Sequence, residues 1–254
     1  MFFCHYVLKN IMFKFKQFTI HQDRTAMKVG TDGVLLGAWA PISSNAQRLL
    51  DIGTGTGLIA LMLAQRLTPN SSLLTISAID IDQSSIEQAT ENIKNSPFAQ
   101  HITTYHTSLQ NHNPQEKYDA IVCNPPYFVA SLKCPDAQRT QARHTDSLSF
   151  EDLLFHSARL LNDGGSLSVI LPVTEGNQLI DLAPKYGFTL THLTEVHPTP
   201  TAPPKRLLLQ FVKQNSQLNH SSLLISHSSL TIEITRHQYT PEYIALTRDF
   251  YLKM

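Results

Sequence analysis

Residues 48–57 read Arg48-Leu49-Leu50-Asp51-Ile52-Gly53-Thr54-Gly55-Thr56-Gly57, and this stretch decides the fold. An apolar run of strand length leads into three alternating glycines, and helical spacing follows from Leu58 to about Leu67. Glycines allow a tight strand-to-helix turn and let a ligand approach the backbone closely. The N-terminus of the following helix favours an anion. The stretch predicts a nucleotide-binding unit, although a tight turn without a ligand has the same local pattern.

Outward from this unit, strand and helix patterns alternate along the chain. The predicted strands cover residues 48–52, 74–79, 101–106, 118–123, 167–171, 188–196 and 207–212. The predicted helices cover residues 58–67, 83–95, 150–161, 174–186 and 241–250, and an edge strand is expected at 231–234. This repeated order predicts an α/β fold with a mostly parallel, doubly wound sheet and right-handed crossovers.

Composition restricts the possible classes of protein. The 254 residues have 42% hydrophobic content, which is enough for one full core. Lys+Arg and Asp+Glu both number 20, so any nucleic-acid contact must come from a local basic patch. Three scattered cysteines argue against a disulfide scaffold and fit a reducing cytoplasm. No apolar run is long enough to span a membrane, and no Cys/His cluster has metal spacing, so we expect neither.

A second motif, Asn124-Pro125-Pro126-Tyr127, directly follows the predicted strand 118–123. Open α/β sheets bind ligands at this C-terminal end of their strands. Two prolines fix two φ angles and remove two N–H groups, so the nearby carbonyls can point at a ligand. An amide before them and an aromatic ring after them suit the binding of a planar amine by its two N–H donors. A rigid loop with a packing tyrosine is the alternative interpretation.

Two acidic residues accompany the glycines. Asp51 comes two residues before Gly53, and Asp80 ends the next predicted strand, 23 residues past Gly57. The position of Asp80 suits hydrogen bonds to both ribose hydroxyls of a nucleotide. A dinucleotide fingerprint would place its third glycine at Leu58, whereas here it comes one residue earlier. The spacing therefore disfavours a nicotinamide dehydrogenase.

Together these motifs resemble those of class I S-adenosylmethionine-dependent methyltransferases, in the branch that methylates amino groups. More narrowly, the chain resembles the bacterial tRNA adenine N6-methyltransferases that modify the adenosine beside the anticodon of a valine tRNA. Residues 18–22, 28–39 and 239–243 carry this narrower resemblance, which spans about residues 12–254. It implies a Rossmann-like fold with a seven-stranded, mostly parallel sheet and helices on both faces. It also implies S-adenosylmethionine as cofactor and tRNA as partner. We further expect a monomer, and the cysteine content favours a cytoplasmic location.

The resemblance also implies roles for individual residues. The catalytic residues would be Asn124, Pro125, Pro126 and Tyr127, with Tyr127 stacking on the target base. The cofactor-binding residues would be Asp51, Gly53, Gly55, Gly57, Asp80, Ile81, Ser108 and Asn124, with Asp51 helping to hold the methionine ammonium. The substrate-binding residues would be Tyr127, Arg139, Arg143 and Lys28. Lys28, Thr31 and Asp32 would close over the cofactor.

Basic residues near the expected site are candidates for contacts with RNA phosphates. Arg139 and Arg143 have the spacing of one helical face, and the pair Lys205-Arg206 follows a proline-rich loop. Such contacts orient an RNA without reading its sequence.

Ser108 departs from the family pattern. The third strand of these enzymes is commonly followed by an acid that accepts a hydrogen bond from the cofactor's adenine amine, and this chain has His106-Thr107-Ser108-Leu109 there. A charge-assisted hydrogen bond is roughly twice as strong as a neutral one. We therefore expect weaker cofactor binding, or compensation by a backbone carbonyl.

Three other functions compete with this interpretation. A protein glutamine N5-methyltransferase is one of them, since a side-chain amide nitrogen poses the same chemical problem to the same motif as an adenine amine. Such enzymes, however, typically carry a helical substrate domain before the glycine-rich turn. Here about fifty residues precede the turn, and they are not clearly helical. A guanine N2- or DNA adenine N6-methyltransferase stays open. A non-catalytic RNA-binding protein is disfavoured because Asp51, Asp80, Asn124 and Tyr127 are all present.

The expected organisation is simple. Met12 offers a second plausible start, so residues 1–11 are a possible upstream extension. Residues 12–254 are expected to form a single methyltransferase domain. Within it, the Ser/Asn/His-rich residues 213–229 are predicted to be a loose linker or a hairpin.

Overall fold

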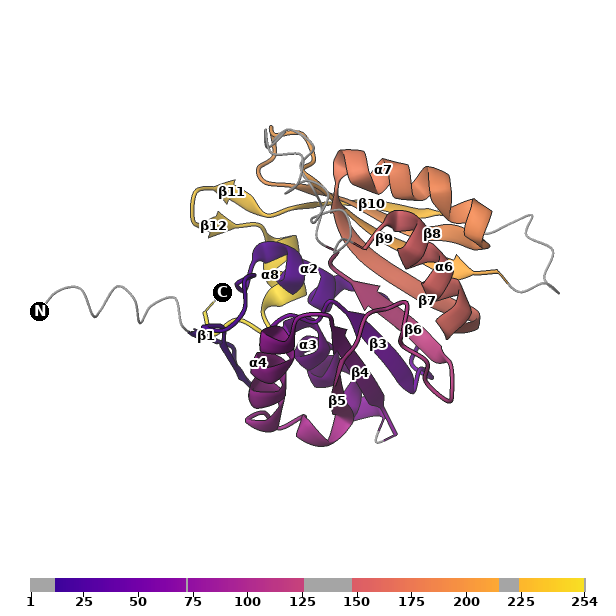
Figure 1. Ribbon diagram of the computed structural model, residues 1–254. Helices are drawn as coiled ribbons and strands as arrows, with labels where there is room; N and C mark the ends of the chain where they lie inside the picture. Colours follow the sequence, from indigo (N-terminus) through magenta and orange to yellow (C-terminus); the bar gives the residue numbers. More distant parts are fainter. Residues whose placement is uncertain (1–11, 72, 126–147, 215–223, 254) are drawn as a thin grey trace, which may run out of the picture.

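The computed structural model describes residues 12–71, 73–125, 148–214 and 224–253 (Figure 1). Its main sheet has the strand order β10-β8-β9-β7-β6-β3-β4-β5. The bounds are β3 Arg48–Ile52, β4 Thr75–Asp80, β5 Ile102–His106, β6 Tyr118–Cys123, β7 Leu161–Pro172, β8 Phe188–His197, β9 Arg206–Lys213 and β10 Ser226–Thr231. Strand β9 runs antiparallel to β7 and β8, and the other neighbouring pairs are parallel. The predicted α/β fold with a mostly parallel sheet is confirmed.

The sequence predicts seven strands and, over residues 213–229, a loose linker or a hairpin; the structure has one strand more, which begins within that stretch. Residues 215–223 lie outside the described residues. Ser226–Thr231 forms an eighth strand, β10, which pairs with β8 at the edge of the sheet. Most of its side chains are exposed. It therefore lacks the apolar alternation that marks a strand in sequence, and backbone pairing holds it. The edge strand expected at 231–234 is instead a hairpin of β11 (Glu233–Thr235) and β12 (Gln238–Tyr239).

The helices are α2 Thr31–Trp39, α3 Leu58–Leu67, α4 Gln83–Lys94, α6 Phe150–Leu160, α7 Val173–Leu182 and α8 Pro241–Thr247. Short 3₁₀ segments lie at Thr68–Asn70, Ala99–His101 and Ala183–Tyr186, and a small hairpin of β1 (Met12–Lys14) and β2 (Thr19–His21) precedes α2. Six consecutive residues of α2 are buried, so it has no polar face to reveal it in sequence. Pro184 lies where the predicted helix 174–186 changes to a 3₁₀ turn.

Helices cover both faces of the sheet. Neighbouring strand residues alternate between two apolar cores: Leu49 and Val122 pack on one side, Leu50 and Ile121 on the other. Helices α2, α3, α4 and α8 contribute to the first core, while α6 and α7 contribute to the second (Figure 1). Burial on both faces explains why the central strands read as continuous apolar runs. No helix among the described residues is long and apolar enough to cross a membrane.

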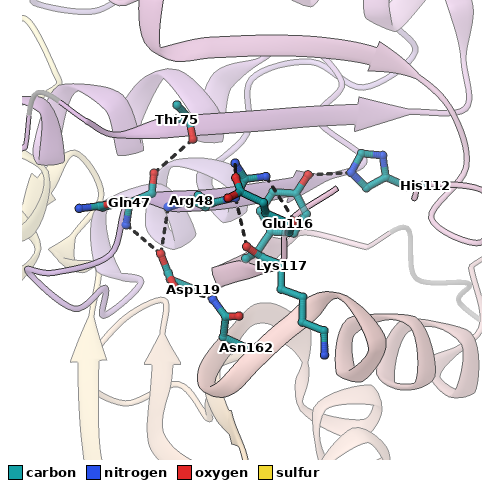
Figure 2. A network of polar contacts seen from close by, with 9 residues as sticks. Gln47, Arg48, Thr75, His112, Glu116, Lys117, Asp119 and Asn162 are labelled. Carbon is teal, nitrogen blue, oxygen red and sulfur yellow. Dashed lines mark hydrogen bonds and ion pairs between the residues drawn. The ribbon is translucent and has the colours of Figure 1, made fainter. Parts of the chain in front are cut away.

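A polar network joins three strands near their N-terminal ends (Figure 2). The Asp119 carboxylate accepts hydrogen bonds from the backbone N–H groups of Gln47 (2.9 Å) and Arg48 (3.0 Å) and from the Asn162 amide (2.9 Å). Burial acts to raise the pKa of Asp119, but these hydrogen bonds and the Arg48 charge outweigh it and lower that pKa. Arg48 also pairs with Glu116 at 2.7 Å. Asp119 therefore ties β3, β6 and β7 together.

Replacing Asp119 by alanine is expected to lower the free energy of unfolding by about 1–3 kcal/mol, because two backbone N–H groups lose their acceptor. Urea titration followed by the fluorescence of Trp39, the one tryptophan in the sequence, measures this change. Lys117→Ala is the matched control, since that exposed side chain takes no part in the network. Equal midpoints for the two variants would contradict the expectation.

Candidate active site

The glycine-rich turn lies between β3 and α3. Gly53, Gly55 and Gly57 have φ angles of 67°, 54° and 81°, in the left-handed region that side chains disfavour. The N–H groups of Gly53 and Thr54 donate to the carbonyl of Ile79 at 2.9 and 3.0 Å, which fixes the turn to β4. A Cβ atom at Gly53 would meet no atom within 4 Å. Glycine at this position therefore supplies the backbone angle and leaves open space above the turn.

Asp51 lies fully buried beneath this turn. One carboxylate oxygen, Oδ2, accepts hydrogen bonds from Thr54 Oγ1 (2.7 Å) and from the Ala60 N–H (3.2 Å). The other, Oδ1, has no hydrogen-bond partner among the described residues. Burial raises the pKa of Asp51 to about 7, against the opposing effect of its two hydrogen bonds. In this geometry Asp51 supports the turn from below and does not line the cavity.

Asp80 ends the neighbouring strand β4. Its Oδ2 accepts the Gly55 N–H at 2.9 Å, and its Oδ1 accepts the Asp82 N–H at 3.0 Å. A carboxylate has about four lone-pair positions, so each oxygen keeps one for a further donor. Ile81 follows and is 55% exposed. A carboxylate with free lone pairs and an exposed apolar side chain are therefore neighbours at the end of β4. This pair suits the hydroxyls and the ring of a nucleoside.

A cavity of about 870 Å³ lies at this rim of the sheet. Nine residues predicted for the site line it: Lys28, Thr31, Asp32, Gly53, Gly55, Asp80, Ile81, Ser108 and Asn124. Asp51, Gly57 and Pro125 lie outside the lining, Gly57 as the residue before α3. Pro126, Tyr127, Arg139 and Arg143 lie outside the described residues. The volume is in the range of small-molecule and cofactor sites.

Asn124 stands at the end of β6 and contributes to the cavity wall. Its Oδ1 is buried and has no hydrogen-bond partner among the described residues. A buried amide oxygen normally accepts a hydrogen bond, so this one is placed for a donor that a ligand brings. Cys123 beside it is buried, and burial raises the pKa of its thiol well above the ordinary value. That thiol is therefore a small apolar group and not a nucleophile.

Ser108 lies in the wall as the sequence predicts. Its Oγ accepts the Asn111 N–H at 3.3 Å, and its carbonyl accepts the His112 N–H at 3.0 Å. The hydroxyl thus lies at the cavity and is engaged with the following turn.

A segment that ends in the first turn of α2, which we name the strap (residues 22–33), forms much of one wall. Its residues Lys28, Thr31 and Asp32 were predicted to close over the cofactor, whereas residues 22–27 were not predicted to lie at the cavity. Lys28 Nζ donates to the carbonyls of Gln22 and Thr25, the latter at 2.9 Å. The Gln22 side chain accepts the Val29 N–H at 2.7 Å. The Lys28 ammonium therefore closes the strap on itself, and its predicted contact with RNA stays a prediction.

Arg206 joins the cavity wall from the start of β9. Its Nε lies 2.8 Å from Asp32 Oδ2, in the first turn of α2. From the sequence, Arg206 was expected only in a basic pair with Lys205, because nothing in the sequence links residues that lie 174 positions apart. The reversed direction of β9 brings its first residue to the rim where the parallel strands end.

Among the described residues, no three His, Cys, Asp or Glu side chains gather as a metal site. The polar groups that line the cavity include the Asn124 amide, the Ser108 hydroxyl and the Asp80 carboxylate.

Comparison with known proteins places this geometry in a family. The model of the methyltransferase small domain matches residues 34–187. A protein of Parabacteroides distasonis named tRNA1(Val) (adenine(37)-N6)-methyltransferase is 51% identical over 97% of this chain and 100% of its own length. One of Flavobacterium psychrophilum with the same name is 48% identical over 96% and 100%.

Solved structures agree on the fold. A predicted O-methyltransferase of Agrobacterium tumefaciens superposes with a TM-score of 0.65 at 21% identity, over 86% of this chain and 96% of that chain. The chain therefore belongs to the family of S-adenosylmethionine-dependent enzymes named tRNA1(Val) (adenine(37)-N6)-methyltransferases.

Proposed function

We propose that this protein transfers the methyl group of S-adenosylmethionine to N6 of an adenosine in tRNA, namely adenosine 37 of the valine tRNA that its relatives' names specify. The observation that carries the proposal is the buried Asn124 Oδ1 at the cavity, which lacks a hydrogen-bond donor among the described residues. An amine with two N–H groups supplies such a donor. Near-full-length identity to the relatives supports the choice of adenine in tRNA.

The residues around the cavity fit the cofactor. Gly53 and Gly55 leave open backbone for its methionine part, and the remaining lone pairs of Asp80 suit the ribose hydroxyls. Ile81 offers an apolar surface for the adenine ring, and Ser108 a hydroxyl for its amine. When bound, S-adenosylmethionine supplies an electrophilic methyl group on a positively charged sulfur. Asp51, whose Oδ1 has no hydrogen-bond partner among the described residues, would attract the positively charged cofactor from beneath the turn, and Gly57 would support the turn.

The chain's own part in the chemistry is orientation. An exocyclic adenine amine is a poor nucleophile, because its lone pair is delocalised into the ring. The Asn124 side-chain oxygen and the Pro125 carbonyl would accept its two N–H bonds, which turns the lone pair toward the methyl group. These acceptors also stabilise the positive charge that develops on nitrogen. The proton leaves after transfer, so no strong base is needed first.

Four further residues, which lie outside the described part of the chain, take their roles in this proposal from the sequence interpretation. Tyr127 would stack on the target base, an interaction worth about 1–3 kcal/mol in single-strand binders, and Pro126 would keep the motif rigid. Such a site cannot reach a stacked base, so the adenosine must lie in a loop or be flipped out. Arg139 and Arg143 would contact phosphates. We propose a monomer acting in the cytoplasm, where tRNA is modified.

The glutamine N5-methyltransferase alternative is not favoured. The described residues before the glycine-rich turn form one small hairpin and the nine-residue helix α2, which is no helical substrate domain. The relatives' names likewise do not favour guanine or DNA as substrate.

Replacing Ser108 by aspartate is expected to lower the cofactor Kd by about threefold to tenfold, because a charged acceptor binds an amine more strongly than a hydroxyl does. Calorimetry with S-adenosylhomocysteine measures the change. Ser108→Ala serves as the paired variant and should raise the Kd. If all three proteins bind equally, Ser108 does not face the adenine amine.

The proposed function is tested by incubating the protein with methyl-labelled S-adenosylmethionine and tRNA from cells that lack the enzyme. We expect label in N6-methyladenosine after digestion of the tRNA to nucleosides. Label in a co-incubated release factor, with none in tRNA, would favour the glutamine enzyme instead.

A further inference from the structure

The start of the strap is fastened to α4 by a buried side chain that the proposed mechanism does not use. Asn92 is fully buried, and its Nδ2 donates to the carbonyls of His21 (2.8 Å) and Thr56 (2.9 Å). Its Oδ1 accepts the His21 N–H at 2.9 Å. Both ends of the amide are thus engaged with backbone groups of two separate segments. One segment is the strand that leads into the strap, and the other is the glycine-rich turn.

Two neighbours on α4 contact the same part of the strap. Gln88 is fully buried, and its Oε1 accepts the Arg24 N–H at 3.3 Å. Glu91 pairs with the Arg24 side chain at 2.9 Å, although both are well exposed. Residues three and four apart lie on one helix face, so Gln88, Glu91 and Asn92 form a single polar edge of α4. This edge holds the strap at His21 and Arg24.

The segments that Asn92 joins are both walls of the cavity. Thr56 belongs to the lining, and so do residues 25–33 of the strap. Asn92 itself does not line the cavity. Its hydrogen bonds therefore fix the distance between two walls from outside, where no ligand contacts it.

We propose that Asn92 is a positioning residue for the cofactor, which sets cofactor affinity by holding the strap against the glycine-rich turn. A strap released at His21 spends part of its time away from the turn. The apparent Kd then rises in inverse proportion to the fraction of molecules that hold the binding-competent arrangement. This inference rests on the proposed function only for the cavity being the cofactor site, and not for the identity of the methyl acceptor.

A variant of Asp119 is the matched control that separates a positioning role of Asn92 from a general effect on stability. Its side chain also makes three hydrogen bonds that join separate segments, but it does so at the opposite ends of the strands (Figure 2). Asn92→Ala and Asp119→Ala each remove three such bonds. General loss of stability affects both variants, whereas release of the strap affects the first alone.

The test measures the Kd of S-adenosylhomocysteine by calorimetry for both variants, together with hydrogen exchange of the peptide that covers the strap. We expect Asn92→Ala to raise the Kd by about tenfold or more, which corresponds to a strap in place in about a tenth of the molecules. Exchange should quicken in residues 22–33 and stay unchanged in β7 and β9. Asp119→Ala should shift the Kd by less than about twofold, within the usual error of such comparisons.

A second variant tests the proposal if Asn92→Ala does not fold. Gln88→Ala removes one hydrogen bond to the strap and is expected to raise the Kd by about twofold to fivefold. Equal Kd changes in the Asn92 and Asp119 variants, or an unchanged Kd in folded Asn92→Ala, would overturn the proposal. Because the wild-type protein is assayed with tRNA in parallel, absence of tRNA methylation with intact cofactor binding would refute the proposed function alone.

Discussion

Replacing Asn124 by alanine is expected to slow methyl transfer by about 10²- to 10³-fold, the usual effect of removing one preorganised group that stabilises transition-state charge. The buried Oδ1 of Asn124 has no other partner among the described residues, so its removal leaves the target amine without one of two acceptors. Cofactor affinity should change by less than about threefold, because Asp80 and the glycine-rich turn stay intact. Single-turnover kinetics with labelled cofactor and saturating tRNA measure the rate.

Asn124→Asp is the informative companion variant. It keeps an oxygen acceptor in place and adds a negative charge, so it should retain more activity than Asn124→Ala. If Asn124→Ala transfers methyl groups at the wild-type rate, the amine is held by other groups and the mechanism proposed above is wrong.

The second large effect concerns Asp51 and pH. Cofactor affinity is expected to rise by about tenfold between pH 6 and pH 8, because the positively charged cofactor favours the ionised form of a carboxyl whose pKa burial has raised to about 7. Asp51→Asn should remove most of this dependence, since the amide keeps similar contacts with Thr54 and Ala60 but cannot ionise. Calorimetry across this pH range measures both profiles.

The same carboxyl governs the stability of the ligand-free protein in the opposite direction. Its folded pKa of about 7 lies above the ordinary value of 3.8, so between these values the folded state holds a proton that the unfolded chain has lost. The free energy of unfolding should therefore fall as pH rises toward 7 and then level off. Thermal melts of wild type and Asp51→Asn should diverge across this window. A wild-type protein without any slope in affinity or melting would contradict the assignment.

The sequence predicted those parts of the site that local pattern determines. The glycine-rich turn, Asp80, Ile81, Ser108 and Asn124 all lie where strand ends were expected, since parallel strands bring their C-terminal ends to one rim. The first part of the strap, residues 22–27, was missed because its order comes from tertiary hydrogen bonds to Asn92 and Gln88, and not from its own periodicity. Asp51 was predicted as a direct contact, and only the structure reveals its position beneath the turn.

Two elements of the fold were not predicted from the sequence, for related reasons. Strand β10 carries mostly exposed side chains, so nothing in its composition separates it from a polar linker. Helix α2 is buried almost all round, which removes the periodicity that marks a surface helix. The hydrophobic pattern of a sequence reveals elements that have one exposed and one buried face, and these two elements lack that contrast.

The reversed strand β9 has a consequence for how the rim of the sheet can vary. Because β8 and β9 form a hairpin, residues 198–205 between them are a surface connection that leads to Arg206 in the cavity wall. Doubling the length of a flexible connection costs only about 0.6 kcal/mol, so such a loop can grow or shrink during evolution without harm to the sheet. The half that holds the glycine-rich turn lies several strands away. The length of this connection can therefore vary while the glycine-rich turn stays unchanged.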